Sequence, residues 1–179
     1  RAREGSRLPG PFDHLDPRRH LLLRRLPRHL PVDDLRLTDS ELAALRATLD
    51  QLVATVGAAT GAPDGVGVDH LPLRRLGRNA PVADIFATVT TPDERRRLLA
   101  SPLRDVDEIC ARTFAIKEAA AKALGGGPAG QIDWRDLRLP TLGARPLVVD
   151  APTLPDRRLH AASARVAGLA LAVASAHRA

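Results

Sequence analysis

The segment from Asp105 to Leu124 predicts a long helix, and it constrains the fold more than any other part of the sequence. It begins with the acidic run DVDE and is stopped by Gly125, which is the charge and glycine pattern expected at the two ends of a helix. A short apolar strand bounded by glycines precedes it at Gly65–Leu71, and further strand candidates follow it. This order of elements predicts a mixed α+β unit.

Several shorter elements complete the predicted unit. Two short helices are expected before the long one, at Pro81–Ala87 and after Thr91, where Thr91 is an N-cap candidate and Pro92 occupies the first helical position. After the long helix, the last two strands are expected to pair across a short turn at RVAG. The four strand candidates are Ile132–Leu139, Arg145–Val149, Leu159–Ala164 and Gly168–Ser175.

The N-terminal third differs from the rest in composition. Residues 1–37 are rich in Arg and Pro and predict an extended arm. An amphipathic helix is expected at 38–57, because Thr38 and Glu41 have capping-box spacing and one apolar stripe follows. The stripe consists of Leu42, Leu45, Leu49, Leu52, Val53 and Val56. With a linker at Gly57–Pro63, the sequence divides into an N-terminal extension (1–62) and a domain (63–179).

Composition narrows the class of protein. The 179 residues suit one domain, and with three Phe, one Trp and no Tyr the core must consist mostly of Leu, Val and Ala. No apolar run approaches the ~18 residues of a membrane span, and the first residues lack the apolar core of a secretory signal. The single Cys110 lies inside the predicted long helix and is expected to be a small core residue. These features predict a soluble cytoplasmic protein.

The formal charge of +6 and the pI near 11.0 raise the question of nucleic acid. We do not favour a nucleic-acid partner, because the arginines are scattered and few aromatic residues are available for base stacking. A basic surface also suits phosphorylated small molecules and acidic protein partners.

The only two lysines of the chain lie in the stretch FAIKEAAAKALGGG, at positions 117 and 122. One interpretation is a solvated helix face, and the other is a site for phosphate and metal. Glu118 and Lys122 are four residues apart and share a helix face. If the strand at Gly65–Leu71 packs on that face, Asp69 meets Glu118, and the two carboxylates repel unless a cation such as Mg²⁺ lies between them. An arginine is the alternative partner for either acid.

Four segments in order resemble a 4′-phosphopantetheinyl transferase, most closely the small holo-acyl-carrier-protein synthase type. They are GVD (67–69), TPDER (91–95), ARTFAIKEAAAKALGGG (111–127) and IDWRDLRL (132–139). The resemblance covers about residues 65–176 and leaves the first 62 residues uncovered. It implies an antiparallel sheet with packed helices, here with an N-terminal helical extension.

The resemblance also implies an activity in fatty acid or polyketide biosynthesis. Such enzymes move the phosphopantetheine arm of coenzyme A onto a serine of an apo-acyl carrier protein and release adenosine 3′,5′-bisphosphate. Carried over by position, Asp69 and Glu118 would hold Mg²⁺ and Lys122 would neutralise charge on the phosphate. Glu118, or a water that it orders, would take the proton of the serine. Contacts to coenzyme A are expected from Lys117, Gly125, Gly126, His160 and Arg165.

Some positions depart from the family pattern. His70, Leu71 and Pro72 follow Asp69 where many relatives have an acid, which leaves two protein ligands for the metal. Ala162 and Arg165 stand where polar groups are expected near the last strand. Arg165 either replaces a phosphate contact or marks a lost proton-relay position, and His160 either bonds within the sheet or contacts coenzyme A. We expect Trp134 to be structural, and His177 to be solvated.

The resemblance further implies a homotrimer with coenzyme A bound between subunits, although the helix at 38–57 could cover part of that interface. The carrier partner is expected to be acidic. Two other classes of function remain open. A non-catalytic scaffold would bind a carrier protein or coenzyme A without turnover, and a nucleic-acid-binding module would bind tightly with a steep salt dependence.

Overall fold

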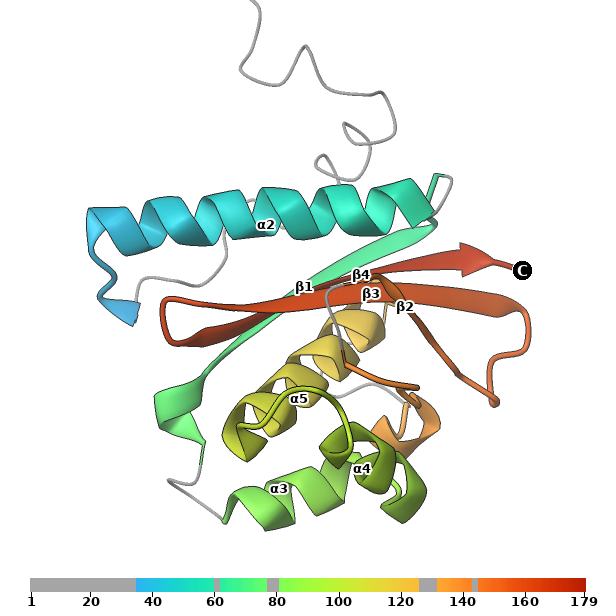
Figure 1. Cartoon of the computed structure of the whole chain (residues 1–179). Helices are drawn as coiled ribbons and strands as arrows, with labels where there is room; N and C mark the ends of the chain where they lie inside the picture. Colours follow the sequence, from blue (N-terminus) through green and yellow to red (C-terminus); the bar gives the residue numbers. More distant parts are fainter. Residues whose placement is uncertain (1–34, 60–61, 77–80, 126–131, 143–144) are drawn as a thin grey trace, which may run out of the picture.

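The computed structural model describes residues 35–59, 62–76, 81–125, 132–142 and 145–179, and it shows one antiparallel sheet between two helical layers (Figure 1). The helices are α2 (Asp39–Ala59), α3 (Val82–Val89), α4 (Pro92–Leu99) and α5 (Val106–Ala123), and the short 3₁₀ turns are η2 (Leu73–Arg75) and η3 (Trp134–Asp136). The strands are β1 (Gly65–Pro72), β2 (Leu147–Val149), β3 (Arg157–Val166) and β4 (Leu169–Arg178). The predicted α+β class is confirmed.

The four strands lie in the order β1-β4-β3-β2, and every neighbouring pair is antiparallel. β3 and β4 form the predicted hairpin, and its turn residues Ala167 and Gly168 both have positive φ, at 48° and 71°. β1, the first strand in sequence, pairs with β4, the last, from Gly65 opposite Ala176 onward. The strand that contains GVGVD therefore pairs with the C-terminal strand of the chain.

The two faces of the sheet are covered by different helices. α5 packs on one face, with α3 and α4 outside it, and α2 crosses the other face (Figure 1). The core on the α2 side contains Leu45, Leu52, Val53 and Val56 of the predicted stripe together with Val68, Leu171 and Val173 of the sheet. None of the helices in these described ranges combines the length and the apolar character required to cross a membrane.

The predicted N-terminal helix is confirmed and is slightly longer than expected. Thr38 and Glu41 form the capping box, since the backbone N–H of Glu41 donates to Thr38 Oγ1 and that of Thr38 donates to Glu41 Oε2. The helix continues to Ala59, and Gly57 is buried in it, so the expectation of a linker from Gly57 was wrong at its start. Residues 1–34 of the arm predicted at 1–37 lie outside the described residues. Leu35 is buried in the core between α2 and the sheet.

One strand prediction is wrong. The predicted strand at 132–139 is instead the 3₁₀ turn η3 (Trp134–Asp136), and of its other residues Arg138 makes an isolated bridge to Asp150. The side chain of Asp133 accepts a hydrogen bond from the backbone N–H of Arg135 at 2.9 Å. This local bond favours a turn over an extended strand.

Cys110 lies in the core, as predicted. Its side chain is fully buried, and burial raises the pKa of the thiol to about 11, with the charge of Asp107 adding to the effect. A thiol with so high a pKa is almost entirely protonated at neutral pH and is therefore unreactive.

β1 and α5 approach each other more closely than side chains allow. A Cβ atom added at Gly67 would lie 1.9 Å from the carbonyl oxygen of Ala119, and one at Gly65 would lie 1.9 Å from that of Ala123. The small residues on both elements let the two backbones touch. This contact brings Asp69, two residues after Gly67, against the last turns of α5.

We predict that Gly67→Ala destabilises the protein by about 3 kcal/mol, because the added methyl group meets the α5 backbone and neither element can yield freely. Gly125→Ala is the matched control. Its Cβ meets nothing within 4 Å, so only the strain of φ +81° remains, at about 1 kcal/mol. Urea unfolding measures both values. Equal losses for the two variants would contradict the close contact.

Candidate functional site

α5 carries the two lysines of the chain on different sides. Lys117 points into the protein interior and its side chain has no exposed surface. Its ammonium donates to the carbonyl oxygen of Val89 at 2.6 Å, to Glu94 Oε2 at 2.8 Å and to the carbonyl oxygen of Trp134 at 2.9 Å. An ammonium has three donors, so these contacts use all of them.

Glu94 is equally buried and equally well bonded. Its Oε1 accepts from the backbone N–H of Leu139 at 2.8 Å, and Glu94 is also the third residue of α4, where it forms a capping box with Thr91. Burial lowers the pKa of Lys117, and the bond to Glu94 opposes that shift. The predicted contact of Lys117 with coenzyme A is therefore wrong, since this lysine has no donor to offer and no exposed atom.

Lys122 faces β1. Its ammonium lies 2.6 Å from Asp69 Oδ1 and 3.3 Å from the carbonyl oxygen of Val68. The Asp69 side chain is 14% exposed and that of Lys122 is 39% exposed, so the pair sits at an accessible edge of the packed layer. The structure thus brings together these two predicted residues, and the partner of Asp69 is a lysine rather than an arginine.

Glu118 lies one helical turn before Lys122 and is half-buried. Burial raises its pKa, and the negative charge of Asp69 raises it further, while Lys122 acts in the opposite direction. Burial likewise raises the pKa of Asp69, against the opposing effect of Lys122. Each shift has the sign expected for a carboxylate that is partly removed from water, and Lys122 offsets only part of the effect.

The donor set at this point fits a magnesium ion. The Lys122 ammonium pairs with Asp69, and Glu118, which also feels the charges of Asp69 and Lys122, adds a second carboxylate in a partly buried place. Among the described residues no group of three or more His, Cys, Asp or Glu side chains gathers anywhere. Two carboxylates suit Mg²⁺, which completes its coordination with waters and substrate phosphates, better than they suit metals that need an all-protein cage.

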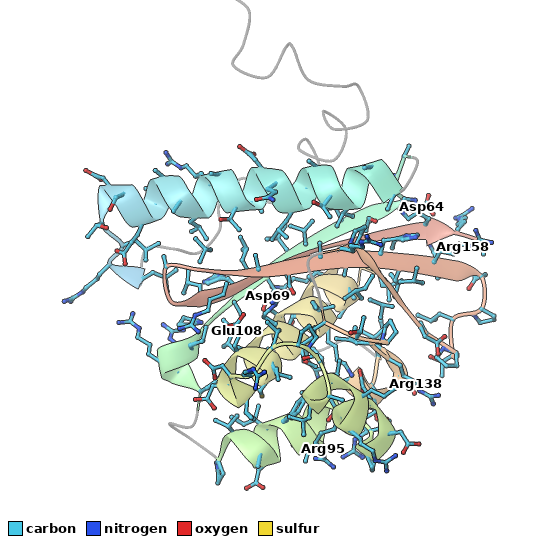
Figure 2. All side chains as sticks on the ribbon, viewed as in Figure 1. Asp64, Asp69, Arg95, Glu108, Arg138 and Arg158 are labelled. Atoms are coloured by element: carbon cyan, nitrogen blue, oxygen red, sulfur yellow. The ribbon has the colours of Figure 1, made fainter. Side chains whose placement is uncertain are left out.

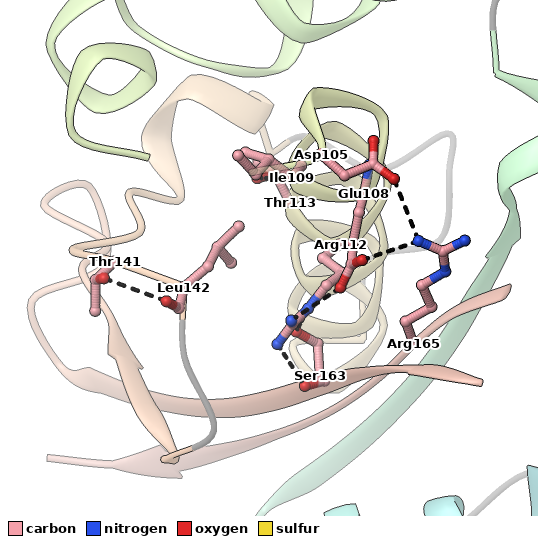
Figure 3. A network of polar contacts seen from close by, with 9 residues as sticks. All are labelled: Asp105, Glu108, Ile109, Arg112, Thr113, Thr141, Leu142, Ser163 and Arg165. Atoms are coloured by element: carbon pink, nitrogen blue, oxygen red, sulfur yellow. Dashed lines mark hydrogen bonds and ion pairs between the residues drawn. The ribbon is translucent and has the colours of Figure 1, made fainter. Parts of the chain in front are cut away.

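Arg165 lies away from this cluster. Its guanidinium pairs with Asp105 Oδ2 and Glu108 Oε2, each at 3.2 Å, beside the first turn of α5, whereas Lys122 lies in the last turn (Figure 3). Within the same network the buried Arg112 donates to the hydroxyl and the carbonyl oxygen of Ser163. Within one chain these contacts tie α5 to β3 and do not place Arg165 in the site.

His160 also lies elsewhere. It alternates with Leu159 and Ala161, which face α5, so it shares the α2 side of the sheet with Ala162. Its ring packs edge-on against His177 with centroids 5.7 Å apart, and its Nδ1 is buried without a hydrogen-bond partner among the described residues. His177 bonds Ser175 at 3.0 Å and is half-buried in β4, so the expectation of a solvated His177 was wrong.

Three further residues singled out in the sequence are Gly125, Gly126 and Trp134. Gly125 ends α5 with φ +81°, and no described residue would lie within 4 Å of a Cβ atom added to it. Gly126 lies outside the described residues. Trp134 stacks on Phe114 at 5.3 Å and its carbonyl oxygen binds Lys117, which fits the structural role expected for it.

A pocket of about 450 Å³ adjoins Lys122 at the end of α5. Gly125 lines it on the helix side, and Asp64, Arg157 and Arg178 line it on the sheet side. No motif of the sequence pointed to these last three residues, because they lie in three different strands or strand ends and meet only in the fold.

The chain matches known proteins over the part that forms the sheet and α5. The family model described as the 4′-phosphopantetheinyl transferase superfamily matches residues 65–174. The holo-[acyl-carrier-protein] synthase of a Xanthobacter autotrophicus strain is 40% identical over 80 residues, which span 44% of this chain and 58% of that relative. The synthase of a Methylobacterium strain is 38% identical over 117 residues, or 64% of this chain and 78% of the relative.

Solved structures support the same fold. A holo-(acyl-carrier-protein) synthase from Bacillus anthracis, crystallised with coenzyme A (3′,5′-ADP), has a TM-score of 0.54 at 20% identity and covers 64% of this chain and 96% of its own. The synthase from Neisseria meningitidis has a TM-score of 0.52 at 21% identity and covers 65% of this chain and 99% of its own. At this identity the likeness concerns the fold. The N-terminal residues that form α2 lie outside the family match.

The two lysines are expected to behave differently on substitution. Lys117→Met should cost about 3–5 kcal/mol, because it leaves the carboxylate of Glu94 buried without its cation. Lys122→Met should cost less, about 1–2 kcal/mol, since the lysine is 39% exposed and the pair lies at the edge of the packed layer. Urea unfolding of both variants measures the difference. Equal costs would contradict the assignment of Lys117 to the core and Lys122 to the site.

Glu118→Gln should raise the melting temperature at pH 7 by roughly 1–3 °C. The raised pKa of Glu118 means that the folded state holds the proton more tightly than the unfolded state, so ionised Glu118 is a cost above the unfolded pKa. The gain should vanish at low pH, where the carboxyl is protonated in both states. Glu41→Gln is the control of opposite sign, because bonds to Thr38 lower the pKa of Glu41. A lower melting temperature for Glu118→Gln at pH 7 would disprove the account.

Proposed function

The chain belongs to the 4′-phosphopantetheinyl transferase superfamily, and on that premise we propose that it transfers the phosphopantetheine arm of coenzyme A to a serine of an apo-acyl carrier protein. The observation that carries this proposal is the convergence of Asp69, Glu118 and Lys122 at an accessible edge between β1 and α5. Asp69 and Glu118 are 49 positions apart in the sequence, and the packing of β1 on α5 brings their segments together.

The site supports a magnesium ion held by Asp69 and Glu118. When bound, the ion would neutralise charge on the pyrophosphate of coenzyme A and polarise its phosphorus–oxygen bonds. Lys122, already bonded to Asp69 and to the carbonyl oxygen of Val68, would direct its third donor to the phosphate oxygens on which charge accumulates. The backbone at Gly125 leaves the space that the nucleotide needs to approach the end of α5.

Glu118 is our candidate for the base. The serine oxygen attacks the phosphorus that carries pantetheine while Glu118 accepts the hydroxyl proton. The bond from that phosphorus to the adenosine 3′,5′-bisphosphate oxygen breaks, and this product leaves. Its place on the face of α5 that meets β1, beside Asp69 and Lys122, puts its carboxylate next to the proposed reacting phosphate.

An acidic carrier protein fits the surface around the site. η2 follows β1 directly and exposes Arg74 and Arg75, and the positive charge of Arg75 reaches His70, the neighbour of Asp69. The chain as a whole carries a formal charge of +6. Such a surface would speed the encounter with an acidic partner and make it sensitive to salt.

We also propose a homotrimer. Within one chain His160 and Arg165 are remote from Lys122, so they can serve the site only as residues of a second copy. α2 covers the sheet face that carries His160, so the residue that a neighbouring copy could reach is Arg165, whose side chain is 48% exposed. Light scattering coupled to gel filtration gives the mass of the assembly, and a monomer would exclude a contribution from a second copy.

A non-catalytic scaffold is the second candidate. The observation that favours it is the stretch after His160, where Ala162 is buried in the α2-side core and Arg165 is tied to Asp105 and Glu108. A scaffold would bind coenzyme A or a carrier protein and leave both unchanged.

Intact-mass spectrometry of an apo-acyl carrier protein, incubated with this chain, coenzyme A and Mg²⁺, separates the two candidates. We expect the carrier to gain one phosphopantetheine group, with the rate reduced at least ~100-fold in Glu118→Ala because base and metal ligand are lost together. Asp93→Ala, which removes an exposed carboxylate on α4, is the control and should keep full activity.

A chelation experiment tests the metal dependence of the reaction. Removal of divalent ions should stop the reaction and Mg²⁺ should restore it, and Mg²⁺ with coenzyme A should raise the melting temperature of the unmodified chain but not of Glu118→Ala. No mass gain with any carrier while coenzyme A still binds would favour the scaffold.

A further inference from the structure

Two histidines lie side by side on the α2 side of the sheet. His160 belongs to β3 and His177 to β4, and they are diagonal neighbours, because His160 is opposite Ser175 and His177 is opposite Arg158. Their rings approach edge-on, with centroids 5.7 Å apart. The candidate magnesium site lies between β1 and α5, on the other side of the sheet, so this pair is a separate cluster of titratable groups.

The hydrogen bonds of His177 assign its lone pair to one nitrogen. Its Nε2 lies 3.0 Å from the hydroxyl oxygen of Ser175. The ring also bonds the backbone of Ala62, and because this bond raises the pKa of His177, the ring supplies the proton. Nδ1 is the nitrogen left for Ala62, and a neutral imidazole carries one proton, so the lone pair is on Nε2. Metal-binding histidines commonly donate their other N–H to a backbone carbonyl in this way.

His160 supplies a second nitrogen. Its Nδ1 is buried and has no hydrogen-bond partner in the part of the chain that the structure describes. A buried polar atom without a partner is destabilising, which favours a ligand at this nitrogen. The hydroxyl of Ser175 is opposite His160 in the register and bonds His177, so the two rings flank one further oxygen ligand.

Both imidazoles are mainly neutral at pH 7, which is the form that binds a metal ion. Burial lowers the pKa of His160, and the positive charges of His177 and Arg158 lower it further. Burial also lowers the pKa of His177, against the bond to Ala62 and the negative charge of Asp64. Arg158 and Asp64 both lie at this end of the sheet (Figure 2). One positive and one negative side chain therefore act on the pair, and their effects on a bound cation oppose each other.

The spacing of the two rings fits a single ion. With Zn–N bonds of about 2.0–2.1 Å and a tetrahedral angle, two imidazoles on one Zn²⁺ have centroids about 5.3 Å apart. The observed 5.7 Å is close to this value, so small rotations of the side chains would bring both nitrogens to one ion. Imidazole suits Zn²⁺ and its neighbours in the first transition row, whereas Mg²⁺ prefers oxygen.

The pair is accessible from solvent. Val148 of β2 is the direct partner of His160, shares its face of the sheet and is 55% exposed. α2 therefore leaves the β2 edge of this face uncovered, and the rings of His160 and His177 are half-buried rather than enclosed. An ion can reach the two rings along this edge, and waters can complete its coordination.

We propose that His160 and His177 form a second metal site, which takes Zn²⁺ or a similar imidazole-binding ion. A bound ion would join β3 to β4 at this end of the sheet. Through the bond of His177 to Ala62, it would also support the segment that leads into β1. The inference does not depend on the proposed function, which uses residues on the other side of the sheet.

Calorimetry with Zn²⁺ tests the pair, with Mg²⁺ present in excess so that it competes for the two carboxylates of the candidate site. His160→Gln and His177→Gln should each weaken Zn²⁺ binding at least ~10-fold, because each removes one of the two protein nitrogens. His70→Gln is the matched control, since His70 is also half-buried but lies in β1, and it should leave the affinity unchanged. An unchanged affinity in either His160→Gln or His177→Gln would overturn the site.

Melting temperatures separate metal binding from a merely structural contact of the rings. With Mg²⁺ present, Zn²⁺ should raise the melting temperature of the unmodified chain more than that of His160→Gln/His177→Gln. The melting curves without Zn²⁺ show whether the double variant folds. An equal effect of Zn²⁺ on the two chains would contradict the proposal.

Diffraction from the unmodified chain requires no variant and decides the question if the double variant does not fold. A crystal soaked in Zn²⁺, measured at the zinc absorption edge, should show an anomalous peak within bonding distance of one nitrogen of each ring. Zinc found only at Asp69 and Glu118, or no zinc peak at all, would overturn the histidine site. Either result would leave the proposed transfer reaction to be decided by its own assay.

Discussion

The buried ion pair between Lys117 and Glu94 is the interaction on which the rest of the structure depends. A charge removed from water is costly, and a buried pair is tolerated only when its remaining donors and acceptors are satisfied. Here they are, since the ammonium binds the ends of α3 and η3 as well as Glu94, and Glu94 binds the backbone of Leu139 and caps α4. One lysine thus fixes α3, α4 and the segment after α5 to the centre of α5.

This arrangement also sets the rotation of α5 about its axis. With Lys117 directed into the core, Glu118 and Lys122 are directed to the neighbouring side of the helix, where β1 lies. The glycines of β1 bring that strand into backbone contact with the helix, and Asp69 arrives beside Lys122 as a consequence. The candidate site is therefore the place where two packing constraints meet. One is electrostatic and the other is steric, and neither involves the site residues themselves.

Much of this could be predicted from the sequence, because the signals are local. Thr38 and Thr91 mark helix starts by their spacing to Glu41 and Glu94, and Asp69, Glu118 and Lys122 lie in segments that resemble a known family. The sequence did not reveal features that depend on contacts between segments distant in the chain or on side-chain bonds within a turn. The two lysines look alike in sequence, yet their surroundings differ because Glu94, 23 residues away, is buried against one of them. The contact between His160 and His177 depends on the register of a hairpin. Residues 132–139 contain spaced apolar residues but turn, because the side chain of Asp133 accepts a bond from the backbone N–H of Arg135.

The most direct test of this account is anomalous diffraction from a crystal grown with Mn²⁺, in place of Mg²⁺, and coenzyme A. The account predicts one anomalous peak between the carboxylates of Asp69 and Glu118, in contact with the pyrophosphate, and Lys117 still bound to Glu94 in the core. A peak remote from both carboxylates, or Lys117 turned toward the ligand, would contradict the claim that α5 separates a structural lysine from a reactive one.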